Sequence, residues 1–298
     1  MSNFRRIFIL FLLPLMGLAA CGSSSPVDPP AVEVGRSSLS RAELTAWVVE
    51  RTESEASDVS LPANAVVDVV QQYIGFESLI DLLTDFGVVP TEGELADATM
   101  ELLAAGIPDA SLSMERLTVW QATLNIANAA GPGIEAAYDA HAELLAHELC
   151  TSHILVNGQD EANEIMGLLS DGADFAALAQ ERSQDPGSGA QGGSLGCVPT
   201  GAFVAEFERA VLGALAQGGV VPGETLVGPV PSQFGFHVIR IDEIKAGAVP
   251  VFAEAGPQAL PQLVSMATMT REISVDPRYG TWDPILGQVS PPDGPIEN

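Results

Sequence analysis

The pattern of apolar residues changes near Thr151, and this change divides the chain into two kinds of fold. Before Thr151, apolar residues recur at helical spacing over long stretches. After it, short apolar runs alternate with glycine-rich turns. Helical spacing buries one stripe of a helix, whereas short apolar runs between glycines are typical of strands. Because 298 residues are enough for two domains, the pattern predicts a helical domain followed by a smaller α+β domain.

The first domain, residues 31–148, is predicted to be helical from its capping signals and its apolar spacing. Ser40 precedes Glu43 by three residues, which is the capping box that opens a helix, and the same pattern recurs at Thr91 and Glu94. A short alternating strand is expected at 31–34. Helices are expected at 40–48, 62–86, 91–106, about 111–129 and about 133–148.

The second domain, residues 149–247, is predicted to mix strands and helices, and the remaining residues 248–298 form a C-terminal segment. This segment is expected to be partly helical over 252–273 and then extended or disordered, because its end is rich in Pro, Gly and Asp. A strand at 273–275 is expected to lie beside 31–34. The second domain is expected to contain strands at 153–156, 194–196, 226–230 and 236–241 and helices at 160–170, 173–183 and 203–215.

Residues 1–21 are predicted to be a lipoprotein signal peptide. Arg5 and Arg6 precede an apolar run that is too short to span a bilayer, and the run ends in the lipobox Leu-Ala-Ala-Cys at Cys21. Lipidation of Cys21 would attach the mature chain, through a flexible tether at 22–30, to the outer side of a bacterial cell membrane. The alternatives are a short uncleaved anchor and a secretory leader with a chance cysteine.

The chain is strongly acidic, with a formal net charge of −27 and Lys245 as its only lysine. Nucleic acid and anionic lipid headgroups would be repelled, and no cluster of Lys or Arg reverses this repulsion locally. The charge therefore excludes nucleic acid as a partner.

The chain has three cysteines, and removing Cys21 from the count leaves Cys150 and Cys197 as a possible pair in an oxidising compartment. A bond between them would close a loop of about 47 residues, for which the chain-entropy model gives roughly 4 kcal/mol. The alternative is two buried thiols.

Residues 149–247 resemble the parvulins, a family of peptidyl-prolyl cis/trans isomerases. The resemblance covers about a third of the chain and implies a four-stranded antiparallel sheet with surrounding helices, working without a cofactor. It also implies that Cys197 lies in the strand beside that of His153, which supports pairing with Cys150. The resemblance rests on SHILV at 152–156, GADFA at 172–176, SQD at 183–185, GGSLG at 192–196, FVAEF at 203–207 and SQFGFHVI at 232–239.

The resemblance also implies a site that binds the twisted imide bond more tightly than the planar one, since rotation must break amide resonance. Many parvulins have methionine where this chain has Phe203, and some have cysteine at the position of Asp185. The catalytic cluster implied is His153, Asp185, Ser232 and His237. The proline pocket implied is Leu195, Phe203, Phe207, Gln233 and Phe234.

Each of these residues also has a structural alternative. The two histidines could brace the sheet, Asp185 and Ser232 could be turn residues, and Phe207 could belong to the core. A zinc site is a further alternative, because His147, Cys150 and His153 are spaced by three and His141 is near. No metal is expected, since the change from helix to strand would place these side chains on different faces and a disulfide would use Cys150.

Two features indicate the substrate class. The loop 157–161 lacks the Arg or Lys that a phosphate before proline would need, which favours general X-Pro substrates. The helices around the isomerase region resemble the scaffold of PrsA and SurA foldases, which implies unfolded or nascent secreted polypeptides containing proline as partners. The alternatives are a holdase whose parvulin domain is catalytically idle and a structural lipoprotein of the envelope.

Overall fold

The structure is a computed structural model that describes residues 30–52, 60–292, 294, 296 and 297. The predicted signal peptide, the lipidation site Cys21 and the tether up to residue 29 lie outside the described residues. Within the ranges described, no helix combines the length and the apolar character needed to cross a membrane.

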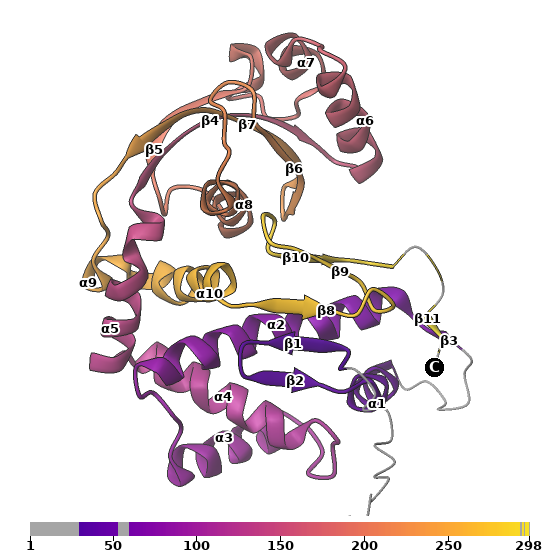
Figure 1. Cartoon of the computed structure of the whole chain (residues 1–298), viewed down its shortest axis with the longest axis vertical. Helices are drawn as coiled ribbons and strands as arrows, with labels where there is room; N and C mark the ends of the chain where they lie inside the picture. Colours follow the sequence, from indigo (N-terminus) through magenta and orange to yellow (C-terminus); the bar gives the residue numbers. More distant parts are fainter. Residues whose placement is uncertain (1–29, 53–59, 293, 295, 298) are drawn as a thin grey trace, which may run out of the picture.

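A four-stranded antiparallel sheet, in the order β5-β4-β7-β6, forms the centre of the second part of the fold. Figure 1 shows this sheet curved around helix α8, with α6 and α7 on its outer side. The predicted α+β fold is confirmed. The elements are β4 His147–Val156, α6 Gln159–Ser170, α7 Phe175–Arg182, β5 Ser194–Pro199, α8 Ala205–Gln217, β6 Leu226–Ser232 and β7 Gly235–Ala246, with a 3₁₀ turn at Gly189–Gln191.

The alternation of side chains along β4 and β7 gives each face of the sheet its own core. Ile154 and Val238 point outward and pack with Phe175 of α7. Leu149 and Ile239 belong to the cluster that also holds the buried face of α8. Because successive strand residues point to opposite faces, His153 and His237 lie on the side of α8.

In the described residues before the sheet there are five α-helices, and both predicted capping boxes are present. The Glu43 N–H donates to Ser40 Oγ at 3.2 Å, and the Glu94 N–H donates to Thr91 Oγ1 at 3.3 Å. In each pair the glutamate carboxylate accepts from the backbone N–H of the capping residue. The helices are α1 Arg41–Thr52, α2 Ala63–Asp85, α3 Glu92–Ala104, α4 Met114–Ala129 and α5 Pro132–His141.

The helix predicted at about 133–148 is too long. Helix α5 ends at His141, a 3₁₀ turn follows at Ala142–Leu145, and β4 begins at His147. The reason is tertiary: β4 pairs with β7 along its whole length, starting with His147 opposite Ala246. These ladder hydrogen bonds override the helical spacing of the local sequence.

The C-terminal segment returns to the helical part and closes it. After α9 Phe252–Ala255, a 3₁₀ turn at Gly256–Gln258 and α10 Ala259–Thr270, strand β8 Ile273–Val275 pairs antiparallel with β1 Val32–Val34. This confirms the strand pair expected from the sequence. β2 Ser37–Leu39 pairs with the other edge of β1. The helical scaffold is therefore made from both ends of the chain, with the sheet inserted between them (Figure 1).

The last described residues are extended, and tertiary contacts hold them. β9 Thr281–Asp283 and β10 Gln288–Ser290 form a hairpin, and β11 Ile296–Glu297 pairs with β3 Ser60–Leu61. The Gln71 amide of α2 donates to Gly287 O and accepts from Val289 N–H. The disordered alternative therefore does not hold for these residues, because their backbone groups form hydrogen bonds with α2. The local sequence pattern does not predict these hydrogen bonds.

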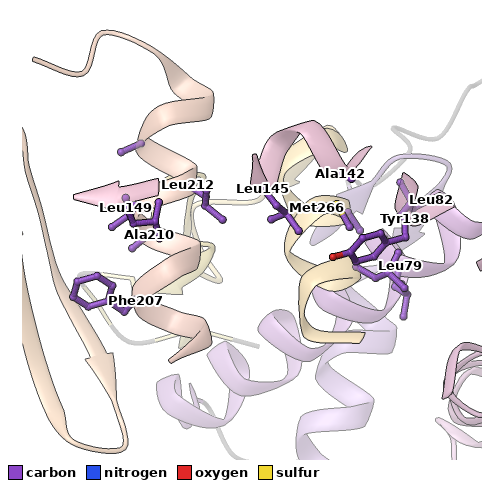
Figure 2. Packing of buried hydrophobic residues seen from close by; sticks show 14 of the residues in the cluster. Leu79, Leu82, Tyr138, Ala142, Leu145, Leu149, Phe207, Ala210, Leu212 and Met266 are labelled. Atoms are coloured by element: carbon purple, nitrogen blue, oxygen red, sulfur yellow. The ribbon is translucent and has the colours of Figure 1, made fainter. Parts of the chain in front are cut away.

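One hydrophobic cluster joins the scaffold to the sheet. Figure 2 shows it running from Phe207 on α8, past Leu145 and Met266, to Leu79 and Leu82 on α2. All five side chains are buried. The two parts of the chain therefore share a core, where the sequence pattern indicated two separate folds.

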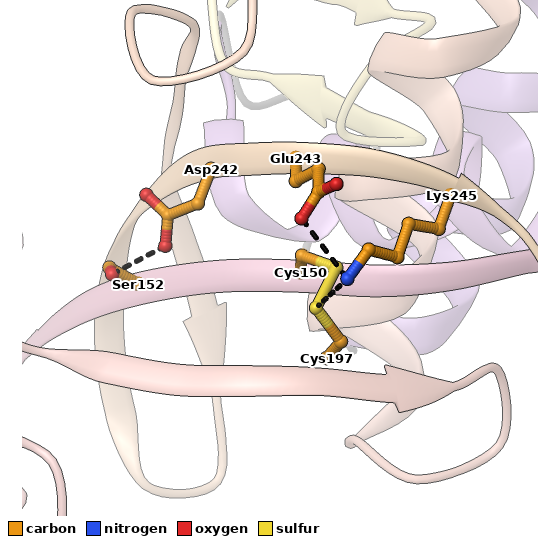
Figure 3. The surroundings of a disulfide bond; sticks show 6 residues. All are labelled: Cys150, Ser152, Cys197, Asp242, Glu243 and Lys245. Atoms are coloured by element: carbon orange, nitrogen blue, oxygen red, sulfur yellow. Dashed lines mark hydrogen bonds and ion pairs between the residues drawn. A yellow bond between two sulfur atoms is a disulfide. The ribbon is translucent and has the colours of Figure 1, made fainter.

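The two cysteines face each other across β4 and β5. Cys150 is directly opposite Cys197 in the ladder, and their sulfur atoms lie 2.10 Å apart, which is bonding distance. Cys150 is buried and Cys197 is exposed. Figure 3 shows Lys245 beside them, with its Nζ 3.4 Å from Cys197 Sγ and 3.1 Å from the Glu243 carboxylate.

Candidate active site

The central strands β4 and β7 bring two buried histidines into contact. His153 and His237 lie 84 residues apart in sequence, yet their Nδ1 atoms are 3.0 Å apart and their rings stack at an interplanar angle of 21°. The strand pairing produces this contact, because His153 is opposite Ile239 and His237 is opposite Leu155 on the same pair of strands.

A hydrogen-bond chain runs through both imidazoles to a carboxylate. Ser232 Oγ is 2.8 Å from His237 Nε2, and His153 Nε2 is 2.8 Å from Asp185 Oδ2. Because an ionised carboxylate only accepts, His153 donates from Nε2 to Asp185, and in the tautomer that carries this proton its Nδ1 accepts from His237. This leaves His237 Nε2 as the acceptor for the Ser232 hydroxyl. Every donor in the chain thus points towards Asp185.

The loop after α7 holds Asp185 in place. Ser188 Oγ donates to Asp185 Oδ2 at 2.5 Å, and the Gly187 N–H donates to Oδ1 at 2.8 Å. Ser188 Oγ is also 3.0 Å from His153 Nε2. These hydrogen bonds, first of all that from Ser188, lower the pKa of Asp185 to about 2 against the opposing effect of burial. The carboxylate is therefore ionised at neutral pH.

Ser188 was missed by the sequence analysis, although it completes the loop. Its signal was the turn sequence Asp-Pro-Gly-Ser at 185–188, in which an aspartate can accept from the backbone two residues later. Ser183 has a similar role, because its Oγ accepts from the backbone N–H groups of Leu155 and Asp185.

His237 is neutral at physiological pH. Its burial lowers its pKa to about 4, the charge of His153 acts in the same direction, and Asp185 opposes both. Only 4% of the residue is exposed. The uncharged imidazole of His237 can therefore donate a hydrogen bond to His153 and accept one from Ser232.

Three of the predicted pocket residues gather on one side of the histidines. Phe207 of α8 places its ring at right angles to His237, with centroids 5.5 Å apart, and lies 6.0 Å from the His153 ring. Phe203 packs against Phe207 at 4.6 Å, and Leu195 of β5 contacts the same cluster. Phe207 is fully buried, whereas Phe203 and Leu195 are half-buried. The apolar surface is therefore layered, with Phe203 and Leu195 nearer to solvent.

The other two predicted pocket residues lie farther out. Gln233 and Phe234 form the turn between β6 and β7, and Phe234 is 58% exposed. The Phe234 N–H donates to Ser232 Oγ at 3.1 Å. The turn thus orients the serine through its backbone, while the two side chains project into solvent.

A buried glutamate supports Phe203. Glu208 of α8 accepts from the backbone N–H groups of Gly201 and Phe203 at 2.7 and 3.0 Å. Burial raises the pKa of Glu208. The sequence analysis missed this residue, although a charged side chain directly after an expected pocket phenylalanine was a visible signal.

The histidines are engaged with each other and with Asp185, which leaves no ring nitrogen of His153 for the zinc alternative. Within the part of the chain that is described, the group of potential metal ligands is Cys150, Cys197 and Glu243. Its two sulfur atoms lie at bonding distance from each other.

We expect folding stability to fall as the pH is lowered from about 6.5 to 4. The folded-state pKa of His237 is depressed, so the unfolded chain takes up a proton first, and the stability contributed by the neutral ring is present above pH 6.5 and lost towards pH 4. The loss is at most about 3 kcal/mol. The depressed pKa of Asp185 extends the loss from about pH 4 towards pH 2, by a smaller amount because its carboxylate is partly exposed.

Urea unfolding at pH 7.5, 5.5 and 4.0 measures this loss. The variant His237→Gln is the control, since it cannot titrate and should lose less stability between pH 6.5 and 4 than the parent chain. Parallel pH profiles for the two chains would contradict the assignment.

Comparisons with known proteins relate the segment that carries this site to a family. Residues 146–245 match the family model described as the PPIC-type PPIASE domain. A relative named Foldase protein PrsA 4, from Bacillus cereus, is 40% identical over 102 residues, which are 33% of this chain and 32% of the relative. A probable parvulin-type peptidyl-prolyl cis-trans isomerase from Bordetella bronchiseptica is 36% identical over 107 residues, which are 36% of this chain and 39% of the relative.

This segment of the chain is therefore a parvulin-type peptidyl-prolyl isomerase domain, as the sequence motifs indicated. The chain spans about a third of the length of the curated relatives it matches. Among solved structures, the PrsA peptidylprolyl isomerase of Bacillus anthracis is 24% identical in sequence, with a TM-score of 0.33. The matched region spans 74% of this chain and 91% of the Bacillus anthracis chain.

Proposed function

We propose that the protein is a peptidyl-prolyl isomerase and foldase that acts on secreted or envelope polypeptides with general X-Pro sequences. The observation that carries this proposal is the hydrogen-bond chain from Ser232 to Asp185, which lies beside the apolar layer of Phe203 and Phe207. In this proposal His153, Asp185, Ser232 and His237 form the catalytic cluster. Leu195, Phe203 and Phe207 hold the proline ring, and Gln233 and Phe234 contact the flanking chain.

The chemistry requires no covalent step. The planar imide is stabilised by resonance and by water on its polarised carbonyl, whereas the twisted imide has a less polarised carbonyl and a more basic nitrogen. An apolar surface that excludes water disfavours the planar form of the imide. A neutral hydrogen-bonding cluster can rearrange its hydrogen bonds as the imide twists, without an ion being formed. The neutral His237 between a hydroxyl and a second imidazole fits this requirement.

The charge around the site supports general substrates. Asp160 and Glu161 occupy the first turn of α6, directly after the loop where a phosphate reader would need cations. Arg182 of the neighbouring helix is already paired with Glu161 and Glu164. A phosphate before proline would therefore meet like charge, so we expect phosphoserine-proline peptides to be poor substrates.

We propose that residues 149–247 form the isomerase domain and that 31–148 and 248–298 form a foldase scaffold around it. The pairing of β1 with β8 supports this division. We also propose that residues 1–21 are a lipoprotein signal peptide, that Cys21 carries lipid and that 22–30 are a tether to the extracytoplasmic side of a membrane. The Leu-Ala-Ala-Cys sequence supports the anchor. Labelled palmitate that appears in the parent chain and equally in Cys21→Ser would overturn it.

A protease-coupled proline-peptide assay tests the isomerase. We expect the parent chain to accelerate isomerisation and Asp185→Asn to lower kcat/KM about 10- to 100-fold, equivalent to about 1.4 to 2.7 kcal/mol. An asparagine amide at this position would present donors to the Ser188 hydroxyl and His153 Nε2, which both need an acceptor. The hydrogen-bond chain would then have to reverse.

Asp171→Asn is the matched control, because Asp171 is an exposed residue of the same domain outside the cluster. It should leave kcat/KM unchanged, and both variants should unfold at similar urea concentrations. A parent rate equal to that of buffer would refute the isomerase and favour the holdase alternative, provided that the chain still suppresses aggregation of an unfolded client.

A further inference from the structure

A buried arginine of α8 contacts α10 and the stretch after β9, where it lines a cavity. Arg209 is 8% exposed. Its Nε donates to Thr268 Oγ1 at 3.2 Å, and its terminal nitrogens donate to Ile285 O and Pro284 O at 3.0 and 3.1 Å. All three acceptors are neutral, and they are the hydrogen-bond partners that Arg209 has within the described ranges.

The charge of this arginine is therefore incompletely compensated. A guanidinium has five N–H groups, of which three have acceptors here. Burial lowers the pKa of Arg209 to about 10, and the charge of Asp283 opposes this effect. The Asp283 carboxylate is itself turned to the backbone, where its Oδ1 accepts from Ile285 and Leu286. A buried cation without a bound anion is costly, so a ligand carboxylate would be stabilised beside Arg209.

The cavity has the size and the walls of a small-molecule site. It measures about 750 Å³ and is bounded by α2, α8, α10 and the β9–β10 turn, elements that lie together in Figure 1. Ligand cavities in proteins commonly measure about 300 to 1,000 Å³. Its apolar lining includes Val67, Phe76, Leu79, Leu124, Val264 and Leu286.

Two further observations point to an occupant. Gly75 lies within α2 on the cavity wall, and a Cβ built there would have no atom within 4 Å. A glycine inside a helix costs about 0.5 to 1 kcal/mol relative to alanine, and here no close neighbour requires it. On the facing α10, the Ser265 hydroxyl is buried and has no hydrogen-bond partner among the described residues. The cavity therefore has empty space beside Gly75, and the Ser265 hydroxyl in its wall is a hydrogen-bond donor without an acceptor among the described residues.

We propose that this cavity binds a small monocarboxylate with one apolar body, such as a medium-chain fatty acid. The carboxylate lies against Arg209, and Ser265 of α10 lines the same cavity. Thr268 links the two elements, because its Oγ1 accepts from Arg209 Nε and donates to the backbone carbonyl of Ser265. The apolar body fills the space above Gly75. This site is separate from the isomerase cluster and does not depend on the proposed isomerase function.

The polar groups of the cavity favour such a ligand over a polypeptide. A peptide would need partners for its amide groups, but the Gln71 amide is already bonded at both ends to Gly287 and Val289. Asp68 and Glu206 are exposed at the lining and would repel further negative charge. A ligand with one carboxylate and no other polar group meets both conditions.

Calorimetric titration of the full chain in detergent-free buffer tests the proposal with octanoate, 1-octanol and octylamine. We expect octanoate to bind at least tenfold more tightly than either of the other two, which share its tail. Gly75→Leu should weaken octanoate binding at least tenfold without lowering the thermal midpoint, since it fills open space and removes a helical glycine. Gly167→Leu is the matched control, because Gly167 is an α6 glycine with equally open space, and it should bind octanoate like the parent.

Arg209→Gln should abolish the preference for octanoate over 1-octanol, and Glu206→Gln should tighten octanoate binding a few-fold. If Arg209→Gln fails to fold, Gly75→Leu still decides. Equal binding of all three probes, tighter binding of octylamine, or unchanged binding by Gly75→Leu would overturn the proposal. Tighter binding of an acetylated apolar tripeptide than of octanoate would also overturn it, in favour of a polypeptide. The proline-peptide rate of Gly75→Leu should equal that of the parent.

Discussion

Replacing Phe207 by alanine is expected to lower the free energy of unfolding by about 3 to 5 kcal/mol and to abolish most of the proposed isomerase activity. The ring is 2% exposed and belongs to the cluster that joins α8, the sheet and the scaffold helix α2. It also meets both imidazoles edge-on, at 6.0 Å from His153 and 5.5 Å from His237. Its removal therefore opens a cavity directly beside the proposed catalytic cluster.

Phe175→Ala separates the two effects, because Phe175 is a comparably buried phenylalanine on the other face of the same sheet. Both variants should lose similar stability in urea unfolding. At a temperature where both are folded, Phe175→Ala should retain its proline-peptide rate and Phe207→Ala should not. Equal rates per folded molecule would return Phe207 to a purely structural role.

Phe203 is the better position for a change of activity alone. It is half-buried and packs on Phe207 at 4.6 Å, so its truncation removes less buried surface. In the proposed pocket it contacts the proline ring, where many parvulins have methionine. Phe203→Met therefore keeps an apolar contact of similar length with a more flexible side chain.

Removing both cysteines is expected to cost up to about 4 kcal/mol of unfolding free energy, the chain-entropy value for a bond that closes a sequence separation of 47 residues. The appropriate variant is Cys150→Ala with Cys197→Ser, because Cys150 is buried and Cys197 is exposed. β5 is the edge strand of the sheet, and among the described residues its strand partner is β4. Without the bond, we expect β5 and the Leu195 that it carries to be held less firmly, which should raise KM more than it lowers kcat.

Urea unfolding of the parent with and without reductant measures this contribution, and the double variant is the control that reductant should leave unchanged. Thiol titration of the denatured, unreduced parent should detect neither Cys150 nor Cys197. Detection of both thiols would show that the pair does not form.

Much of the isomerase domain could be predicted from its residues. The motifs around His153 and His237 identified the family, and strand pairing then required the two histidines to meet. Ser232 followed by the same argument, since it lies just across a two-residue turn from the His237 strand. Such features depend on short-range turns and on the alternation of side chains along strands. Both can be recognised from a few neighbouring residues in the sequence.

The hydrogen-bond partners of these residues were less predictable. Ser188 lies in a loop and donates to Asp185, and Glu208 of α8 accepts from the backbone of Phe203, which also lies in a loop. The path of a loop depends on the elements that it packs against. The helix expected to reach residue 148 ended at His141 for the same reason, because pairing with β7 outweighed local spacing.

The sequence by itself indicated that this chain contains a parvulin domain, that His153 and His237 lie on neighbouring strands, and that a strand at 273–275 lies beside 31–34. These properties follow from periodicity and motif order. Only the tertiary structure decided that scaffold and isomerase domain share a core, and that Arg209 lies buried beside an open cavity. The carbonyls that hold Arg209 come from Pro284 and Ile285, more than 70 residues later in a stretch with no local pattern. Contacts of this kind depend on how the packed elements fit together, and a short stretch of sequence does not carry that information.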